Sequence, residues 1–94
     1  MRITVDISMY PLSEDYKPSI KAFIHKLRAC DGLTLVTNQL STQINGEFEL
    51  VTGAINRCVR ESMQEQFEKG QGKVVFVTRY LNADLDITCL PDID

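Results

Sequence analysis

The sequence predicts an α+β domain whose elements follow the order β-α-β-β-α-β, with two helices on one face of a four-stranded antiparallel sheet. Two observations carry this prediction. Apolar and polar residues alternate near the start and in the middle of the chain, which is the period of strands with one buried face. On either side of the middle, apolar residues repeat every three to four positions, which is the period of an amphipathic helix.

The first strand is predicted over Arg2–Tyr10. The residues expected to face the helices are Ile3, Val5, Ile7 and Met9. The residues between them form the opposite face and are Arg2, Thr4, Asp6, Ser8 and Tyr10. Because Pro11 has no N–H to contribute to a strand ladder, the strand should end there.

The first helix is predicted from about Tyr16 to Cys30. Asp15 is expected to cap its N-terminus, and Gly32 suits the left-handed position at its C-terminus. Its apolar stripe consists of Ile20, Phe23, Ile24 and Leu27. This spacing places one face of the helix against the sheet.

Residues 32–46 predict a central antiparallel hairpin, because two alternating segments lie on either side of a break near Asn38 and Gln39. Two strands so close in sequence are neighbours joined by a tight connection. In the second of them, the side chains expected to face the helices are Leu40, Thr42 and Ile44. The opposite face then carries Ser41, Gln43 and Asn45, a row of hydrogen-bond donors and acceptors.

The Asn45–Gly46 pair has two interpretations. It is typical of a type I′ hairpin turn, but Asn45 is also a good helix N-cap. A helix is favoured, because a long apolar stripe follows whereas strand alternation after Gly46 covers barely two repeats. The stripe consists of Phe48, Val51, Ala54, Ile55, Cys58, Val59, Ser62, Met63 and Phe67. Two glycines, Gly70 and Gly72, should end this helix.

The last strand is predicted over Lys73–Leu81, and its phase is open. Either Phe76, Thr78 and Tyr80 face away from the helices, or Val75, Val77 and Arg79 do. The domain therefore spans residues 1–81. Residues 82–94 form an acidic C-terminal tail, which is expected to be a short edge strand or an extended arm.

This order of elements is the split βαβ arrangement of the ferredoxin-like fold. Right-handed crossovers place both helices on one side of the sheet, whose strands would lie in the order 4-1-3-2. The other sheet face is left open. Ligand binding or subunit assembly is expected there, although an ordinary solvated face has the same polar pattern.

Composition argues against several classes of function. The 94 residues fit one domain, and the net charge of −3 argues against nucleic acid as a partner. The fold resembles RNA-recognition domains, but the central strands lack their stacking aromatic residues. No apolar run is long enough for a membrane span, and no signal peptide is expected. Three widely spaced cysteines suggest reduced thiols and a cytoplasmic protein.

Catalytic groups are scarce. His25 is the only histidine and lies outside the apolar stripe of its helix, so we expect it to be exposed. No cysteine pair has the spacing of a zinc site, and Gly70–Lys73 lacks the spacing of a phosphate-binding loop. The sequence therefore predicts a protein that is not an enzyme and needs no metal or cofactor. Cys30 and Cys58 are expected to be inert packing residues.

Three segments, Ile7–Leu12, Leu40–Gly46 and Val74–Arg79, resemble the YkoF-related thiamine-binding family. These are small ferredoxin-like proteins that were formerly grouped as a domain of unknown function. The resemblance covers about residues 2–81, and its most telling part is the Ser-Thr-x-x-x-Gly segment at Ser41–Gly46. It implies binding of thiamine or its hydroxymethylpyrimidine moiety, and assembly into homodimers or homotetramers through the sheets.

The predicted function is therefore non-enzymatic binding of thiamine or a related pyrimidine, on the open sheet face or at a subunit interface. The alternative is a homo-oligomeric regulatory or assembly module whose open face serves subunit contact. The candidate ligand-binding residues are Asp6, Ser8, Tyr10, Ser41, Thr42, Gln43, Thr78 and Arg79.

Overall fold

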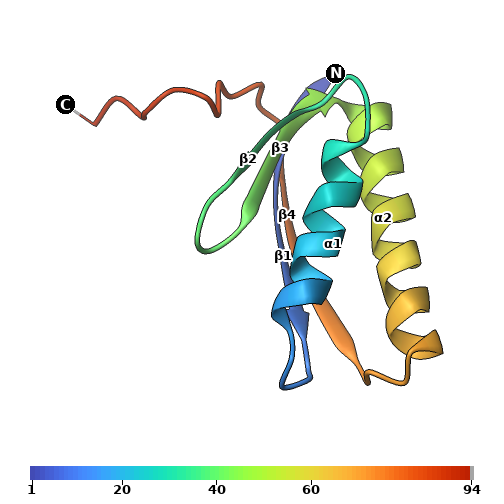
Figure 1. Ribbon diagram of the computed structural model, residues 1–94. Coiled ribbons are helices and arrows are strands. Elements are labelled where there is room, and N and C mark those ends of the chain that lie inside the picture. The colour runs from blue at the N-terminus through green and yellow to red at the C-terminus, as the bar shows by residue number, and fades with distance from the viewer. Residues whose placement is uncertain (94) are drawn as a thin grey trace.

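The computed structural model describes residues 1–93, in which the six predicted elements occur in the predicted order. They are β1 (Arg2–Pro11), α1 (Lys17–Arg28), β2 (Thr34–Thr37), β3 (Thr42–Glu47), α2 (Phe48–Glu68) and β4 (Val74–Leu81). The strands form one antiparallel sheet in the order β2-β3-β1-β4, and both helices cover the same face of it (Figure 1). The predicted α+β ferredoxin-like fold and its strand order are confirmed.

The core lies between the helices and the central strand β1. As predicted, alternate residues of β1 are buried, from Ile3 to Met9. They form one cluster with Phe23 and Leu27 of α1 and with the inner face of α2. The rings of Phe23 and Phe76 lie 5.0 Å apart, so α1 also packs against β4. The buried residues of the cluster are Ile3, Val5, Ile7, Met9, Phe23, Leu27, Ile44, Val51, Ile55 and Cys58.

The hairpin connection is longer than predicted, and Leu40 does not face the helices. The side chain of Asn38 accepts hydrogen bonds from the backbone N–H groups of Leu40 (2.9 Å) and Ser41 (3.1 Å). An Asn side chain that bonds the backbone two residues on holds a turn and interrupts strand pairing. Leu40 therefore lies in the connection and is 86% exposed, whereas Thr42 and Ile44 are buried as predicted.

Both interpretations of Asn45–Gly46 are wrong, because the pair lies inside β3. The helix itself is confirmed, but it begins at Phe48 and is capped by Glu47, whose carboxylate accepts from the backbone N–H of Glu49 at 2.9 Å.

Gly46 is explained by close packing. A Cβ at this position would lie 3.0 Å from the side chain of Leu33 and 3.1 Å from that of Val51. These distances are shorter than ordinary carbon contacts. The glycine therefore lets the start of α2 and the segment before β2 approach β3.

The helix ends differ from the sequence prediction in detail. Tyr16, not Asp15, occupies the N-cap position of α1, and its side chain makes no capping bond. In α2 the predicted stripe is buried from Val51 to Cys58 and again at Ser62, but Phe48, Met63 and Phe67 are exposed, and Gln66 is buried in place of Phe67. Gln66 accepts a hydrogen bond from Ser19 of α1, so the last turns of α2 turn a polar residue toward α1.

The tail, described here from residue 82 to 93, is an extended arm and pairs with no strand among those residues; Asp94 lies outside the described part. Its first residues pack on the open sheet face. The Thr4 hydroxyl donates to the carbonyl of Ala83 (2.8 Å), and Asp84 accepts from Asn45 (2.9 Å) and Arg2 (3.1 Å). Beyond this point the arm leaves the body of the molecule (Figure 1, red).

The hairpin provides a stability test. Ile44→Ala removes a side chain that is completely buried, so the cavity left behind should cost about 2–5 kcal/mol of the free energy of unfolding. Leu40→Ala is the matched control and should cost under about 0.5 kcal/mol, because this residue is exposed. Urea unfolding followed by circular dichroism measures both; equal losses would contradict the placement of Leu40.

Candidate functional site

The strand registers decide which predicted site residues share the open face of the sheet. Residues directly opposite each other on paired strands point to the same side. Asp6 of β1 lies opposite Gln43 of β3 and Arg79 of β4. Ser8 and Tyr10 lie opposite Val77 and Val75, respectively. These registers decide between the two alternatives for the last strand: Val75, Val77 and Arg79 of β4 are on the open face.

Asp6 is the centre of a hydrogen-bonded group on this face. Its carboxylate accepts from the Ser41 hydroxyl at 2.5 Å and from Nη2 of Arg79 at 2.8 Å. Burial raises the pKa of Asp6, but the bonds from Ser41 and Arg79 and the charge of Arg79 outweigh it, so the pKa lies below its ordinary value. Asp6 is therefore ionised at neutral pH and already has its partners.

The other end of the open face is covered by the tail. Asn45 is 5% exposed, and its side-chain amide donates to Asp84 and to the Thr4 hydroxyl. The hydrogen bonds from Asn45 and Arg2 hold the pKa of Asp84 below its ordinary value. Thus many of the polar groups on the open face are engaged with each other rather than presented to a ligand.

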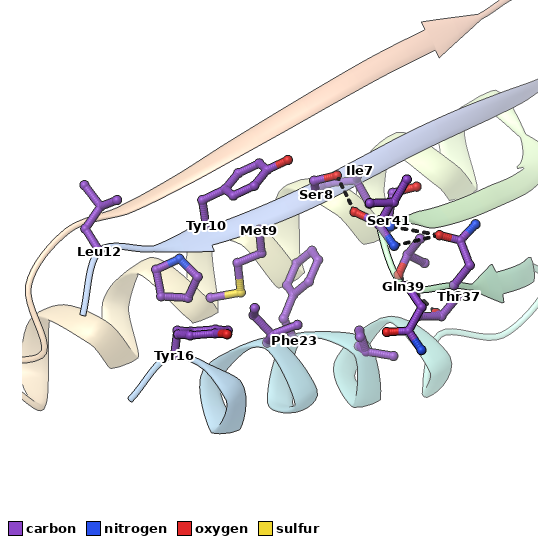
Figure 2. Close-up of a pocket in the computed structure, with 16 residues that line it drawn as sticks. Ile7, Ser8, Met9, Tyr10, Leu12, Tyr16, Phe23, Thr37, Gln39 and Ser41 are labelled. Carbon is purple, nitrogen blue, oxygen red and sulfur yellow. Dashed lines mark hydrogen bonds between the residues drawn. The ribbon is translucent and has the colours of Figure 1, made fainter. Parts of the chain in front are cut away.

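A cavity of about 430 Å³ lies on the helix side, between β1, the first half of α1 and the hairpin connection. Figure 2 shows its two ends. Met9, Tyr16 and Phe23 gather at one end, and Thr37, Gln39 and Ser41 lie at the other. Ligand sites commonly have about this volume and combine apolar walls with a few polar groups.

The cavity exists because β3 is shorter than β1. The pairing of β1 with β3 ends at Ile7, opposite Thr42, whereas its pairing with β4 continues to Pro11. From Ser8 to Pro11, β1 therefore has a strand neighbour on one side only. An unpaired strand edge presents backbone donors and acceptors that a ligand can use. The Ser8 hydroxyl donates to the carbonyl of Leu40 (3.3 Å) and links β1 to the connection.

The structure divides the predicted site residues among three places. Four of them line the cavity: Ser8, Tyr10, Ser41 and Thr42. Three line a shallower pocket of about 350 Å³ on the open face, beside Leu85 and Ile87 of the tail: Asp6, Gln43 and Arg79. Thr78 belongs to neither, because it lies opposite the buried Ile7 and lines a groove next to α2. Thr42 likewise faces the helices rather than the open face, and bonds to Thr37 (3.0 Å).

Sequence reasoning missed the α1 side of the cavity. Tyr16 was not on the apolar stripe, and Phe23 was interpreted only as a core residue. Gln39 was interpreted as part of a turn. The available signal was the difference in strand length, since β1 alternates for nine residues while Asn38 and Gln39 interrupt the hairpin.

Two further findings bear on the type of site. Among residues 1–93, no group of three or more histidine, cysteine, aspartate or glutamate residues is arranged to hold a metal ion. Over the same residues, no helix has the length and hydropathy of a membrane span.

No protein-family model and no curated protein matches this chain, but solved structures do. A provisionally assigned thiamine biosynthesis/salvage protein from Thermotoga maritima superposes with a TM-score of 0.75 at 24% identity, over 93% of this chain and 91% of that one. A domain of unknown function, DUF77, from Bacillus cereus gives 0.70 at 15% identity, over 89% and 78%. A protein from Streptococcus pneumoniae gives 0.68 at 18% identity, over 94% of each chain. These likenesses show a shared fold.

The Asp6 group predicts a pH-dependent contribution to stability. Because the pKa of Asp6 is lowered by folding, its contribution is complete above the unfolded-state pKa of about 3.9 and is lost as the pH falls through the lower folded-state value. Asp6→Asn should lower the melting temperature at pH 7, and the difference from wild type should shrink as the pH falls from about 5 to 2. Thermal melts across that range measure it. Glu14→Gln in the exposed loop is the control; a pH-independent effect of Asp6→Asn would contradict this account.

Proposed function

We propose that this protein binds thiamine or its hydroxymethylpyrimidine moiety in the cavity between β1 and α1, without catalysis, as a cytoplasmic protein. The observation that carries the proposal is the pairing of an aromatic end, at Tyr16 and Phe23, with a polar end at Thr37, Gln39 and Ser41. A flat heterocycle with donors and acceptors on its rim fits both ends of such a cavity.

The chemistry of an aminopyrimidine supports this choice of ligand. Its ring can stack on an aromatic side chain, and its amino group and ring nitrogens can pair with hydroxyl and amide groups. The backbone of β1 from Ser8 to Pro11, which has a strand neighbour on one side only, offers further donors and acceptors. The thiazolium ring of thiamine is cationic, and the net charge of −3 favours its approach.

The comparison with solved structures adds independent support. The Thermotoga maritima protein of the same fold carries a thiamine biosynthesis/salvage assignment in its name. The resemblance of Ile7–Leu12 and Leu40–Gly46 to the YkoF-related family points to the same ligand, and the cavity is lined by the first of these segments and by the start of the second, residues 40–42.

Thermal melts with and without ligand test the proposal. Thiamine at about one hundred times its dissociation constant should stabilise the fold by about 2.7 kcal/mol, which corresponds to a shift of more than about 10 °C for a domain of this size. Tyr16→Ala should remove most of this shift, because it removes an aromatic wall. It should cost little stability without ligand, since Tyr16 is 46% exposed and makes no capping bond.

Gln43→Ala is the matched control, because Gln43 lies on the open face outside the cavity. It should leave the shift unchanged. The opposite pattern, loss with Gln43→Ala and retention with Tyr16→Ala, would move the ligand to the open face. Isothermal titration gives an independent test. If neither thiamine nor hydroxymethylpyrimidine binds at about millimolar concentration, which corresponds to a binding free energy weaker than about 4 kcal/mol, thiamine binding is rejected.

A second candidate function, homo-oligomeric assembly through the open sheet face, is favoured by a specific observation. Tyr10, Val75 and Val77 are 45–51% exposed and adjacent on this face. Adjacent exposed apolar and aromatic side chains on a sheet face are typical of subunit contacts.

Light scattering tests the assembly. At micromolar concentration the mass should be a multiple of 10.7 kDa, because a stable contact of the obligate kind buries about 2,000 Å² or more. Val77→Asp should return the protein to a monomer by placing a charge in the contact. Leu40→Asp, at an exposed position off this face, should not. A wild-type protein that stays monomeric rules out assembly while leaving the binding proposal intact.

A further inference from the structure

The two helices bring a pair of cysteines together on the side of the molecule away from the open face. Cys58 lies in the middle of α2 and is 2% exposed, whereas Cys30 lies two residues beyond the last residue of α1 and is half-buried. Their sulfur atoms are 4.0 Å apart. A disulfide bond needs a separation of about 2.05 Å, so the two sulfurs must approach by about 2 Å.

A cationic side chain points at the more exposed sulfur. Nη2 of Arg57, the residue before Cys58, donates to Sγ of Cys30 at 3.1 Å. This contact places a hydrogen-bond donor at the sulfur that is also the more accessible of the two to a peroxide. Cys58 differs, because burial and the neighbouring Cys30 raise its pKa to about 11, which keeps it protonated at neutral pH.

The position of Cys30 also allows the movement that a bond requires. It follows the C-cap residue Ala29, where its backbone N–H bonds to the carbonyl of Leu27, and it precedes the turn at Gly32. Helix ends fray more easily than helix centres. Cys58, by contrast, is fixed within a helix of 21 residues. The approach can therefore come from Cys30 alone.

From this geometry we infer that Cys30 and Cys58 form a reversible oxidation site, in which hydrogen peroxide oxidises Cys30 and Cys58 then closes a disulfide. In the first step the Cys30 thiolate takes an oxygen from the peroxide and becomes a sulfenic acid. The peroxide O–O bond breaks, and the released hydroxide takes a proton to form water. In the second step the Cys58 sulfur bonds to the Cys30 sulfur, the S–O bond breaks, and the Cys58 proton leaves with the hydroxyl group as water.

This site is separate from the proposed ligand cavity. The cavity is lined by the first half of α1, from Tyr16 to Ile24, whereas Cys30 lies beyond the other end of that helix. The oxidation site thus stands whether or not thiamine binds. A dithiol reductant would restore both thiols.

Peptide mapping after treatment with hydrogen peroxide tests the inference on the full chain with Cys89→Ser, which removes the exposed thiol of the tail. The expected product is a linked Cys30–Cys58 peptide, about 2 Da lighter than its two reduced halves, that dithiothreitol separates. The monomeric mass of the denatured product shows that the link is within one chain.

Three variants in the same background assign the roles. In Cys58→Ser, Cys30 should stop at the sulfenic acid and be captured by dimedone. In Cys30→Ser, Cys58 should remain a thiol, because it is buried. Arg57→Gln should slow the oxidation of Cys30, whereas Arg60→Gln on the same helix should not. Melting curves of the reduced variants establish that each is folded.

Two results would overturn the inference. In the wild-type protein, one such result is that peroxide oxidises Cys89 while Cys30 stays reduced. The other is a Cys30 that proceeds to sulfinic acid while Cys58 stays a free thiol, which would show that the two sulfurs do not meet.

Discussion

Strand β1 is the constraint on which the rest of this structure depends. It lies between β3 and β4 and is the longest strand of the described sheet, and every second side chain from Ile3 to Met9 is buried beneath the helices. Because side chains alternate along a strand, burying that set fixes the opposite set, Thr4 to Tyr10, on the open face. The registers with β3 and β4 then determine which residues of those strands lie beside Asp6 and Tyr10.

The unequal neighbours of β1 give its two ends different surroundings. In the half nearer Arg2, β1 is paired on both sides from Thr4 to Ile7, and its open face is covered by the tail through Thr4, Asn45 and Asp84. At the Pro11 end, pairing with β3 has stopped and a cavity takes the place of the missing strand. The polar groups at the first end satisfy each other. At the second end Ser8, Thr37 and Ser41 are also hydrogen-bonded, but the backbone of β1 is not paired with β3 there and Tyr16 is 46% exposed, which is why the proposed ligand is placed there.

The sequence predicted the fold well because the two periods that define it are long. Nine alternating residues in β1 and five turns of apolar stripe in α2 leave little freedom for other interpretations. The short elements were predicted less well. Leu40 continues the alternation of Thr42 and Ile44, and nothing local reveals that the side chain of Asn38 holds Leu40 and Ser41 in a turn. Gly46 next to Asn45 resembles a turn, yet the glycine is required by Leu33 and Val51, which come from distant parts of the chain.

The site was harder to predict than the fold, because it depends on the residues at which strands and helices end rather than on whether a segment is a strand or a helix. The alternation predicts that Asp6 and Gln43 share the open face, but it leaves the phase of the last strand, and so the position of Arg79, open; only the register of β1 with β4 places Arg79 opposite Asp6. The contact of Asp6 with Ser41 and Arg79, which leaves its carboxylate occupied, comes only from side-chain geometry. The same holds for the cysteines. Each was interpreted alone as a packing residue, and only the packing of α1 on α2 brings the two sulfurs to 4.0 Å.

The ion pair between Arg2 and Asp84 has a practical consequence for how the molecule can be handled. It joins the start of β1 to the first residues of the tail, so both ends of the domain lie at the same pole of the sheet (Figure 1). The mouth of the cavity is at the other pole, near Pro11 and Gln39. A tag, a surface linker or a fused protein at Met1 would therefore lie at the pole opposite the cavity. The domain can be immobilised by that end with the cavity facing the solution.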